Sequence, residues 1–252
     1  MLIDTHCHLD VSDYTNREEL LDKISKSDVK AIVVNGCDVA SSIEAIRLAH
    51  QYSFIYAAVG FHPENCDLIN ENDYILFEEW LKDKKVIAIG EIGLDYHYDE
   101  SNKKRQLQVF ERQLSIARRY NKPVIIHSRD ASNDMYNTLK KYHLEGIIHC
   151  FGDNLELANK YIDLGYMLGI GGIITFKNSD LKDVIKSVSL KNIVLETDAP
   201  YLSPEPYRGL QNSSLNLPII ADAIAKIKDV SYEEVASTTT ANATLLFDFM
   251  PD

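Results

Sequence analysis

Two histidines near the start of the chain have the spacing of a metal-ligand pair. His6 and His8 follow a short apolar run. Side chains two residues apart on a strand point to the same face, so both imidazoles would project together while Cys7 packs behind them. Imidazole is a common ligand of divalent metals. Because the chain contains eight histidines, one such pair arises readily by chance, and its meaning depends on partners elsewhere.

Whether partners converge on this pair depends on the fold. Short β-rich runs alternate with helix-like segments, and the eight candidate strands are residues 2–6, 31–35, 55–60, 86–91, 123–127, 146–149, 166–171 and 192–198. Between them, apolar residues recur with helical spacing, and a capping box at Ser41 and Glu44 predicts the start of one helix. Two further helices are expected at residues 218–228 and 232–248.

This alternation predicts an α/β fold, specifically a (β/α)8 TIM barrel with C-terminal helices. Continuous apolar strands such as residues 31–34 favour burial on both faces, as in a parallel sheet covered by helices. A doubly wound open sheet gives the same alternation, but no Gly-x-Gly-x-x-Gly follows the first strand. No linker or repeat interrupts the pattern, so we expect residues 1–252 to form a single domain.

Six metal-binding side chains lie at the carboxyl ends of the candidate strands, where a TIM barrel builds its active site. They are His6 and His8 on the first strand, Glu91 on the fourth, His127 on the fifth, His149 on the sixth and Asp198 on the eighth. A single histidine at a strand end is more often an ordinary polar residue, whereas six such residues at one end favour a metal centre. Four imidazoles and two carboxylates suit two divalent ions such as zinc, manganese or iron, or magnesium where water completes its shell.

Two neighbouring ions need a shared ligand, and a carboxylate can bridge them while an imidazole cannot. We therefore assign Glu91 as the bridge. His6, His8 and Asp198 are assigned to one ion, and His127 and His149 to the other. Such a pair activates water near neutral pH and holds the attacking and leaving oxygens of a displacement. Asp198, which would touch both metal and water, is the expected general base, so Asp198 and Glu91 are the catalytic candidates.

Further polar residues follow the same strands and could contact a substrate. Arg129 and Arg208 are candidate phosphate ligands through charge-assisted hydrogen bonds. His62 could bind a phosphate oxygen or support a ligand, and it fits a loop cap equally well. Asp95 could orient a metal ligand or a phosphate-binding residue. Surface arginines are common, so neither arginine is decisive alone.

The bulk composition limits the class of protein. The chain has 252 residues, of which 45% are hydrophobic, and its formal net charge is -12. This charge argues against a broad basic face that coats nucleic acid, although a local metal pair can still hold an anion. With no leader and no membrane-length apolar run, we expect a cytoplasmic protein, and nothing in the sequence demands more than a monomer. Four cysteines without a Cys-x-x-Cys fit reduced, packed thiols.

The motifs around these residues resemble those of the TatD family of metal-dependent deoxyribonucleases, within the amidohydrolase-type TIM barrels, over essentially the whole chain. They read Asp4-Thr5-His6-Cys7-His8-Leu9-Asp10, Val59-Gly60-Phe61-His62-Pro63, Ile89-Gly90-Glu91-Ile92-Gly93-Leu94-Asp95-Tyr96, Val124-Ile125-Ile126-His127-Ser128-Arg129-Asp130-Ala131, Ile148-His149-Cys150-Phe151 and Leu195-Glu196-Thr197-Asp198-Ala199-Pro200-Tyr201-Leu202. The resemblance implies the same six metal ligands, with Asp198 also catalytic. It also implies two divalent ions and hydrolysis of DNA phosphodiester bonds, typically from single-stranded or free ends as an exonuclease.

Two segments depart from the family pattern. The family usually continues His-Cys-Phe with Ser-Gly, whereas this chain has Gly152-Asp153. After Tyr-Arg-Gly the family usually has a basic pair and Asn-Glu-Pro, whereas this chain has Leu210-Gln211-Asn212-Ser213-Ser214. The metal ligands are all present, and the differences fall on loops that would face the substrate.

Two other functions compete with the nuclease. The first is a metallohydrolase of an amide, a lactone or an ester at an RNA end. Related barrels often bridge their ions with a carboxylated lysine on the fourth strand, so Glu91 in that place favours the phosphodiesterase. The second is a binding or scaffold protein with a vestigial ligand set, which would hold no stoichiometric metal.

Overall fold

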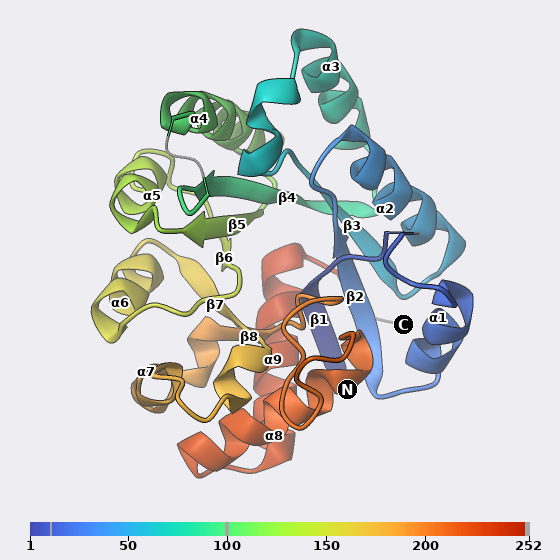
Figure 1. The fold of residues 1–252 in the computed structure, drawn as a ribbon, viewed down its shortest axis with the longest axis vertical. Helices are drawn as coiled ribbons and strands as arrows, with labels where there is room; N and C mark the ends of the chain where they lie inside the picture. Colours follow the sequence, from blue (N-terminus) through green and yellow to red (C-terminus); the bar gives the residue numbers. More distant parts are fainter. Residues whose placement is uncertain (11, 99–100, 250–252) are drawn as a thin grey trace.

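The computed structural model describes residues 1–10, 12–98 and 101–249, and in them eight parallel strands form one nearly closed barrel (Figure 1). The strands follow one another in sequence order around the barrel, which confirms the predicted TIM fold. Their bounds are β1 Leu2–Cys7, β2 Val29–Asn35, β3 Ile55–Val59, β4 Val86–Asp95, β5 Val124–Arg129, β6 Gly146–Ile148, β7 Tyr166–Ile170 and β8 Ile193–Leu195.

Helices surround the barrel and continue beyond its last strand. They are α1 Arg17–Ser25, α2 Val39–Gln51, α3 Glu71–Trp80, α4 Lys103–Tyr120, α5 Ser132–Leu139, α6 Leu155–Asp163, α7 Leu181–Ser187, α8 Leu217–Lys228 and α9 Tyr232–Phe247. The predicted start of α2 was wrong, because Asp38 caps this helix and Ser41 is the third helical residue of the capping box. In the described ranges, no helix has the length and apolarity needed to cross a membrane.

Four strands end elsewhere than expected at the site. β1 ends at Cys7 and β6 ends at Ile148, so His8 and His149 lie just beyond these strands rather than on them. β4 continues past Glu91 to Asp95, and its last residues pair with His127, Ser128 and Arg129 of β5. β8 ends at Leu195, so Asp198 lies on the loop beyond it. A loop residue at that position can adopt the left-handed backbone observed for Asp198, with φ of 55°, which a strand residue cannot.

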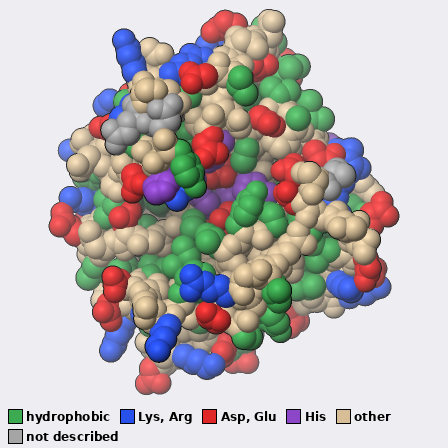
Figure 2. All heavy atoms as spheres, viewed as in Figure 1, with side chains coloured by type: hydrophobic (Ala, Val, Ile, Leu, Met, Phe, Trp, Pro, Cys, Tyr) green, Lys and Arg blue, Asp and Glu red, His purple; other side chains and the backbone are tan. Residues whose placement is uncertain are grey.

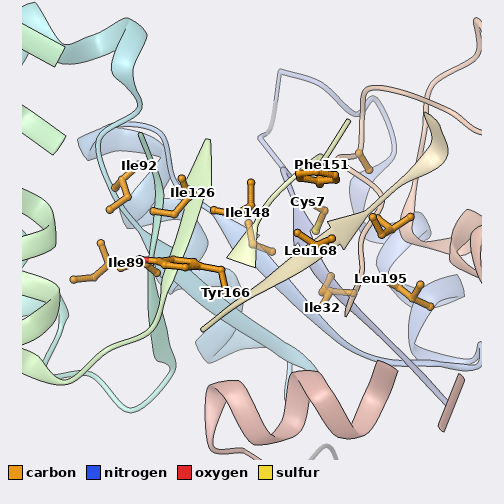
Figure 3. Packing of buried hydrophobic residues seen from close by; sticks show 14 of the residues in the cluster. Cys7, Ile32, Ile89, Ile92, Ile126, Ile148, Phe151, Tyr166, Leu168 and Leu195 are labelled. Carbon is orange, nitrogen blue, oxygen red and sulfur yellow. The ribbon is translucent and has the colours of Figure 1, made fainter. Parts of the chain in front are cut away.

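The buried side chains form two layers because neighbouring residues of a strand point to opposite faces. Ile125 belongs to the inner layer, whereas Val124 and Ile126 belong to the outer layer that packs under the helices. Figure 3 shows part of the outer layer, including Ile126 and Tyr166. The inner layer also receives residues from the end of α9, namely Ala243, Leu246 and Phe247. The barrel interior is therefore packed with apolar side chains, and polar groups gather beyond the ends of the strands.

The barrel closes between β8 and β1 through side chains rather than a full ladder of backbone bonds. Asp4 Oδ1 accepts from the backbone N–H of Thr197 at 2.9 Å, and Asp4 Oδ2 accepts from the Thr197 hydroxyl at 2.6 Å. Both residues are fully buried. Two backbone bonds continue the seam, from Asp198 N to His6 O at 3.0 Å and from His8 N to Ala199 O at 2.6 Å. These bonds hold Asp198 directly beside His6 of β1 and His8, which follows that strand.

Helix α4 fixes two loops through a pair of buried glutamines seven residues apart, a spacing that places both on one helix face. Gln106 accepts from Asp95 N at 2.8 Å and donates to Asp95 O at 2.7 Å. Gln113 accepts from Phe61 N at 2.8 Å and donates to Phe61 O at 3.1 Å. One helix therefore positions Asp95 and the residue that precedes His62.

Replacing Thr197 with valine should destabilise the barrel. The substitution keeps the shape of the side chain but removes the hydroxyl that donates to buried Asp4, and a lost partner of this kind costs about 1–3 kcal/mol. We expect the free energy of unfolding of the metal-free protein to fall by that amount in urea titrations. Thr15→Val, at an exposed position, is the matched control. Equal stability of the two variants would show that this bond does not secure the seam.

Candidate metal centre

The six side chains selected from the sequence meet at the carboxyl end of the barrel. Figure 2 shows histidine side chains at the bottom of a hollow in this face. His6 is fully buried, Glu91 and His149 are 3% and 7% exposed, and a substrate must therefore reach down to them. The donor cluster, as we call it, comprises His6, His8, Glu91, His127, His149 and Asp198.

One half of the donor cluster surrounds the Oε2 atom of Glu91. The Nε2 atoms of His6 and His8 lie 3.1 Å apart, at 3.5 and 3.4 Å from Glu91 Oε2. Asp198 Oδ1 lies 3.5 Å from His6 Nε2 and 3.8 Å from His8 Nε2. Two nitrogens bound to one ion at about 2.0–2.1 Å would be about 2.9–3.4 Å apart, so the histidine pair has ligand spacing.

The other half faces Oε1 of the same carboxylate. His127 Nδ1 lies 2.8 Å and His149 Nε2 lies 3.0 Å from Glu91 Oε1, and the two nitrogens are 3.3 Å apart. Glu91 thus presents one oxygen to each histidine pair. His149 lies at the boundary between the halves, because its ring also stacks on His6 with centroids 3.9 Å apart.

Two of the histidines, His8 and His127, have a hydrogen-bond acceptor at the outer ring nitrogen, whereas Nδ1 of His6 and of His149 has no hydrogen-bond partner among the described residues. His8 Nδ1 lies 3.0 Å from the Asn35 carbonyl, which can only accept a proton. His127 Nε2 lies 2.9 Å from Asp95 Oδ2 in the same way. A proton held on the outer nitrogen keeps the inner nitrogen available to a metal. Burial opposes the charged form of His127, but its hydrogen bonds to Asp95 and Glu91 outweigh burial and raise its pKa, so without metal the inner nitrogen also carries a proton, which a metal would displace. The donor set therefore fits divalent metal ions.

His62 differs from these histidines. Its Nδ1 accepts a hydrogen bond from Glu64 N at 3.3 Å, and its Nε2 lies 3.6 Å from Glu91 Oε1. Burial lowers the pKa of His62 to about 4, so the ring is neutral near pH 7 and its single proton lies on Nε2. His62 therefore both caps its loop and directs an N–H donor into the site, although its atoms are close enough to Glu91 and His127 to form a ligand group.

Burial and mutual charge set the protonation of the carboxyl groups. Burial acts against the ionised form of Glu91, but the facing imidazoles, led by His149, outweigh it and hold its pKa well below the usual range. Burial raises the pKa of Asp198 to about 6, although His149 and His8 act in the opposite direction. A carboxylate with this pKa is a better proton acceptor than an ordinary aspartate and is still ionised near pH 7.

The two arginines lie outside the donor cluster, at exposed positions. The guanidinium carbon of Arg129 lies 5.0 Å from the centroid of the Tyr98 ring, and that of Arg208 lies 4.3 Å from the Phe176 ring. Stacking on a ring supports the guanidinium plane and leaves N–H groups able to bind oxygens, although Arg129 also makes a side-chain hydrogen bond to Tyr98.

Sequence reasoning missed one buried carboxylate behind His149. Glu196 Oε1 accepts from Cys150 N at 2.5 Å and lies 3.5 Å from His149 Nδ1, and Glu196 is fully buried. Its position on the short run from β8 to Asp198 gave no sign of this role. The space for its carboxylate depends on Gly169, where an added Cβ would lie 2.2 Å from Glu196 Oε2.

The loop that departs from the family pattern is anchored at Asn212. This buried side chain donates from Nδ2 to Thr197 O at 2.8 Å and to Tyr201 O at 2.7 Å. Asn212 therefore links the loop to the backbone on both sides of Asp198. Gly152 and Asp153, the other departure, are exposed beyond β6.

Comparison with known proteins gives consistent matches. The model of the family described as TatD related DNase matches residues 3–248. An uncharacterized metal-dependent hydrolase of Bacillus subtilis, YabD, is 40% identical, with 98% of this chain and 99% of YabD covered. An uncharacterized metal-dependent hydrolase of Escherichia coli, YcfH, is 35% identical, with 98% of this chain and 95% of YcfH covered. The crystal structure of the TatD homolog YjjV from Escherichia coli superposes with a TM-score of 0.93, at 31% identity, over 99% of this chain and 98% of that one.

Adding a methyl group at Gly169 should weaken metal binding at the half of the donor cluster that contains His149. The Cβ of Gly169→Ala would displace Glu196, and loss of such a supporting carboxylate typically costs about 10- to 100-fold in metal affinity. Titration of the metal-free protein with zinc against a chromophoric chelator should show one site weakened. Gly171→Ala is the control, because its Cβ would approach no atom closer than 3.6 Å. Equal zinc affinities in both variants would remove Glu196 from the support of the site.

Replacing Gln106 with methionine should loosen Asp95 and hence His127. The variant keeps the volume of the side chain but loses both hydrogen bonds to the Asp95 backbone. We expect about 10-fold weaker binding of one of two zinc ions, with the other little changed. Gln108→Met, on the exposed face of the same helix, serves as the control. If both ions were weakened alike, the glutamine would support the fold rather than this half of the site.

Proposed function

The chain belongs to the TatD related DNase family of metal-dependent hydrolases, and from this premise we propose that it hydrolyses DNA phosphodiester bonds as an exonuclease. The observation that carries the proposal is the division of Glu91 between two histidine pairs, one facing each carboxylate oxygen. His6, His8 and Asp198 would hold one divalent ion, His127 and His149 the other, and Glu91 would bridge them. Zinc, manganese and magnesium are the candidate metals.

When bound, two such ions supply Lewis-acid activation of water and neutralise the charge of a phosphoryl group. The remaining work belongs to the residues of the chain. Asp198 accepts the proton of the attacking water, a role supported by its position beside His6 and His8 and by its raised pKa. Asp95 holds the His127 ring in its ligand orientation.

Other residues would bind the substrate rather than the metal. His62 directs its Nε2–H toward Glu91, where it can donate to a phosphoryl oxygen. Arg129 and Arg208 can each accept a phosphate on a guanidinium edge. A site of this depth and donor content suits the terminal phosphodiester of a single strand, which can be lowered to the bottom of the hollow.

Replacing Asp198 with asparagine should abolish most of the turnover. The amide cannot accept the proton of water, and loss of a general base typically costs about 100- to 10,000-fold in rate. The measurement is kcat on end-labelled single-stranded DNA with magnesium, manganese or zinc, and a chelator control. Asp163→Asn, exposed at the end of α6, should leave kcat unchanged.

Two outcomes would contradict the proposal. An unchanged rate in Asp198→Asn would exclude this residue as the base. Failure of the wild-type protein to cleave DNA, although it binds two ions, would exclude the nuclease. Amide, lactone and RNA-end ester substrates tested beside DNA would then identify the alternative hydrolase.

A further inference from the structure

Helix α9 has an outer surface that is almost without charge. Its two charged residues, Glu233 and Glu234, lie in the first turn, and no charged residue follows from Val235 to Phe247. Helix α4, by contrast, carries charged residues from its first turn to its last. In a chain with a net charge of -12, copies repel one another at most faces, and a long uncharged surface is a place where they do not.

The exposed residues of α9 form one stripe with a projection and a depression. Ser237, Ala241 and Leu245 are exposed and lie four residues apart, so they follow one another along the helix. Leu245 is 80% exposed, the highest value among the large apolar side chains of the described residues. Ser237 and Ala241 have small side chains. The stripe therefore consists of a projecting leucine and, toward the amino end of the helix, a depression.

A cavity of about 590 Å³ runs beside this stripe, and all three stripe residues line it. The rest of its lining is largely apolar and includes Met1 and Tyr232. Two of its hydroxyl groups are hydrogen-bonded within the chain, because Thr240 donates to Met1 O at 3.0 Å and Ser237 donates to Glu234 O at 3.2 Å. A partner can cover these groups without leaving them unpaired, so covering the cavity has a small polar cost.

A second cavity, of about 690 Å³, continues the surface past Leu245 to the amino ends of β4, β5 and β6. In its lining, Lys84 and Lys122 offset the carboxylates of Glu145 and Asp248. Fifteen residues line this cavity and nine line the first, with Leu245 in both. A standard interface uses about 20–30 residues of each partner, so the two cavities together match one half of a dimer interface in size.

We propose that the exposed surface of α9 is the interface of a symmetric dimer, in which a second copy of the chain packs its α9 antiparallel to the first. With a two-fold axis at Ala241, Leu245 lies four residues beyond the axis and Ser237 lies four residues before it. Each leucine therefore enters the depression beside Ser237 of the other copy, and the two alanines meet on the axis. Both donor clusters remain open, because they lie at the opposite ends of the strands.

Shape and charge favour a second copy over another partner. A two-fold interface requires one patch to hold both a projection and its complement, and the stripe does so. Antiparallel packing also brings Glu233 of one copy to the end of the interface where Lys84 and Lys122 line the cavity of the other. The sequence alone demanded no more than a monomer, since the depression beside Leu245 exists only once the helix has packed on the barrel.

Sedimentation equilibrium of the wild-type protein tests the dimer. Between about 1 and 200 µM, we expect the average mass to rise from one chain toward two. Leu245→Glu should raise the Kd by about 100-fold or more, because both halves of the interface lose a central apolar anchor and gain a charge. Leu68→Glu, at a side chain 77% exposed on another face, should leave the Kd unchanged. A wild-type protein that stays monomeric, or a dimer that Leu245→Glu leaves intact, would overturn the proposal.

Cross-linking tests the arrangement of the helices. Residues on a two-fold axis face their own counterparts, so Ala241→Cys should form a disulfide-linked dimer with diamide as the oxidant, seen by non-reducing electrophoresis. Glu234→Cys is the control on the same helix. Seven residues separate position 234 from the axis, which places the two cysteines about 21 Å apart, beyond the reach of a disulfide. Equal cross-linking of the two variants, or none by Ala241→Cys in a protein that dimerises, would exclude the antiparallel arrangement.

Discussion

The burial of one carboxylate charge constrains this end of the molecule. Glu91 is 3% exposed and its pKa is held well below the usual range, so it is ionised in a place where water cannot solvate it. A buried anion persists only where other groups compensate it, and here the compensation comes from imidazoles on both sides. Those imidazoles belong to β1 and the residue just after it, to β5 and to the loop after β6, and the parallel strands of the barrel bring these segments to one end.

Holding these groups in place requires rigid supports outside the donor cluster. The seam between β8 and β1 fixes Asp198 beside His6, and the glutamines of α4 fix Asp95 and the neighbour of His62. Each glutamine pairs its buried side chain with a backbone N–H and a C=O group, and at the seam buried Asp4 accepts from the backbone N–H and the hydroxyl of Thr197. Such bonds are costly to break in an apolar interior, so they define one arrangement of the site.

The sequence was sufficient to predict the barrel, the order of its strands and the six residues that meet at its end. These predictions succeeded because the alternation of strands and helices and the parallel topology bring residues at strand ends together, whatever their separation in the chain. Prediction from the sequence failed where the role of a residue depends on three-dimensional packing. Nothing in the local pattern distinguishes Glu196, which lies behind His149, from an ordinary strand-end glutamate, and Gly169 has meaning only because that carboxylate occupies its face. Likewise, the double role of His62 required the positions of both ring nitrogens.

An acidic surface is compatible with the proposed binding of a phosphate because electrostatic forces are short-ranged in salt. At physiological ionic strength the Debye length is about 8 Å, so divalent ions held in the donor cluster would attract a phosphate near the bottom of the hollow and little beyond it. Exposed carboxylates on the loops outside the hollow, such as Glu64 and Asp153, would for the same reason hardly weaken that attraction. The net charge of -12 therefore bears on how a substrate approaches the protein, whereas the buried donor set would determine where its phosphate binds.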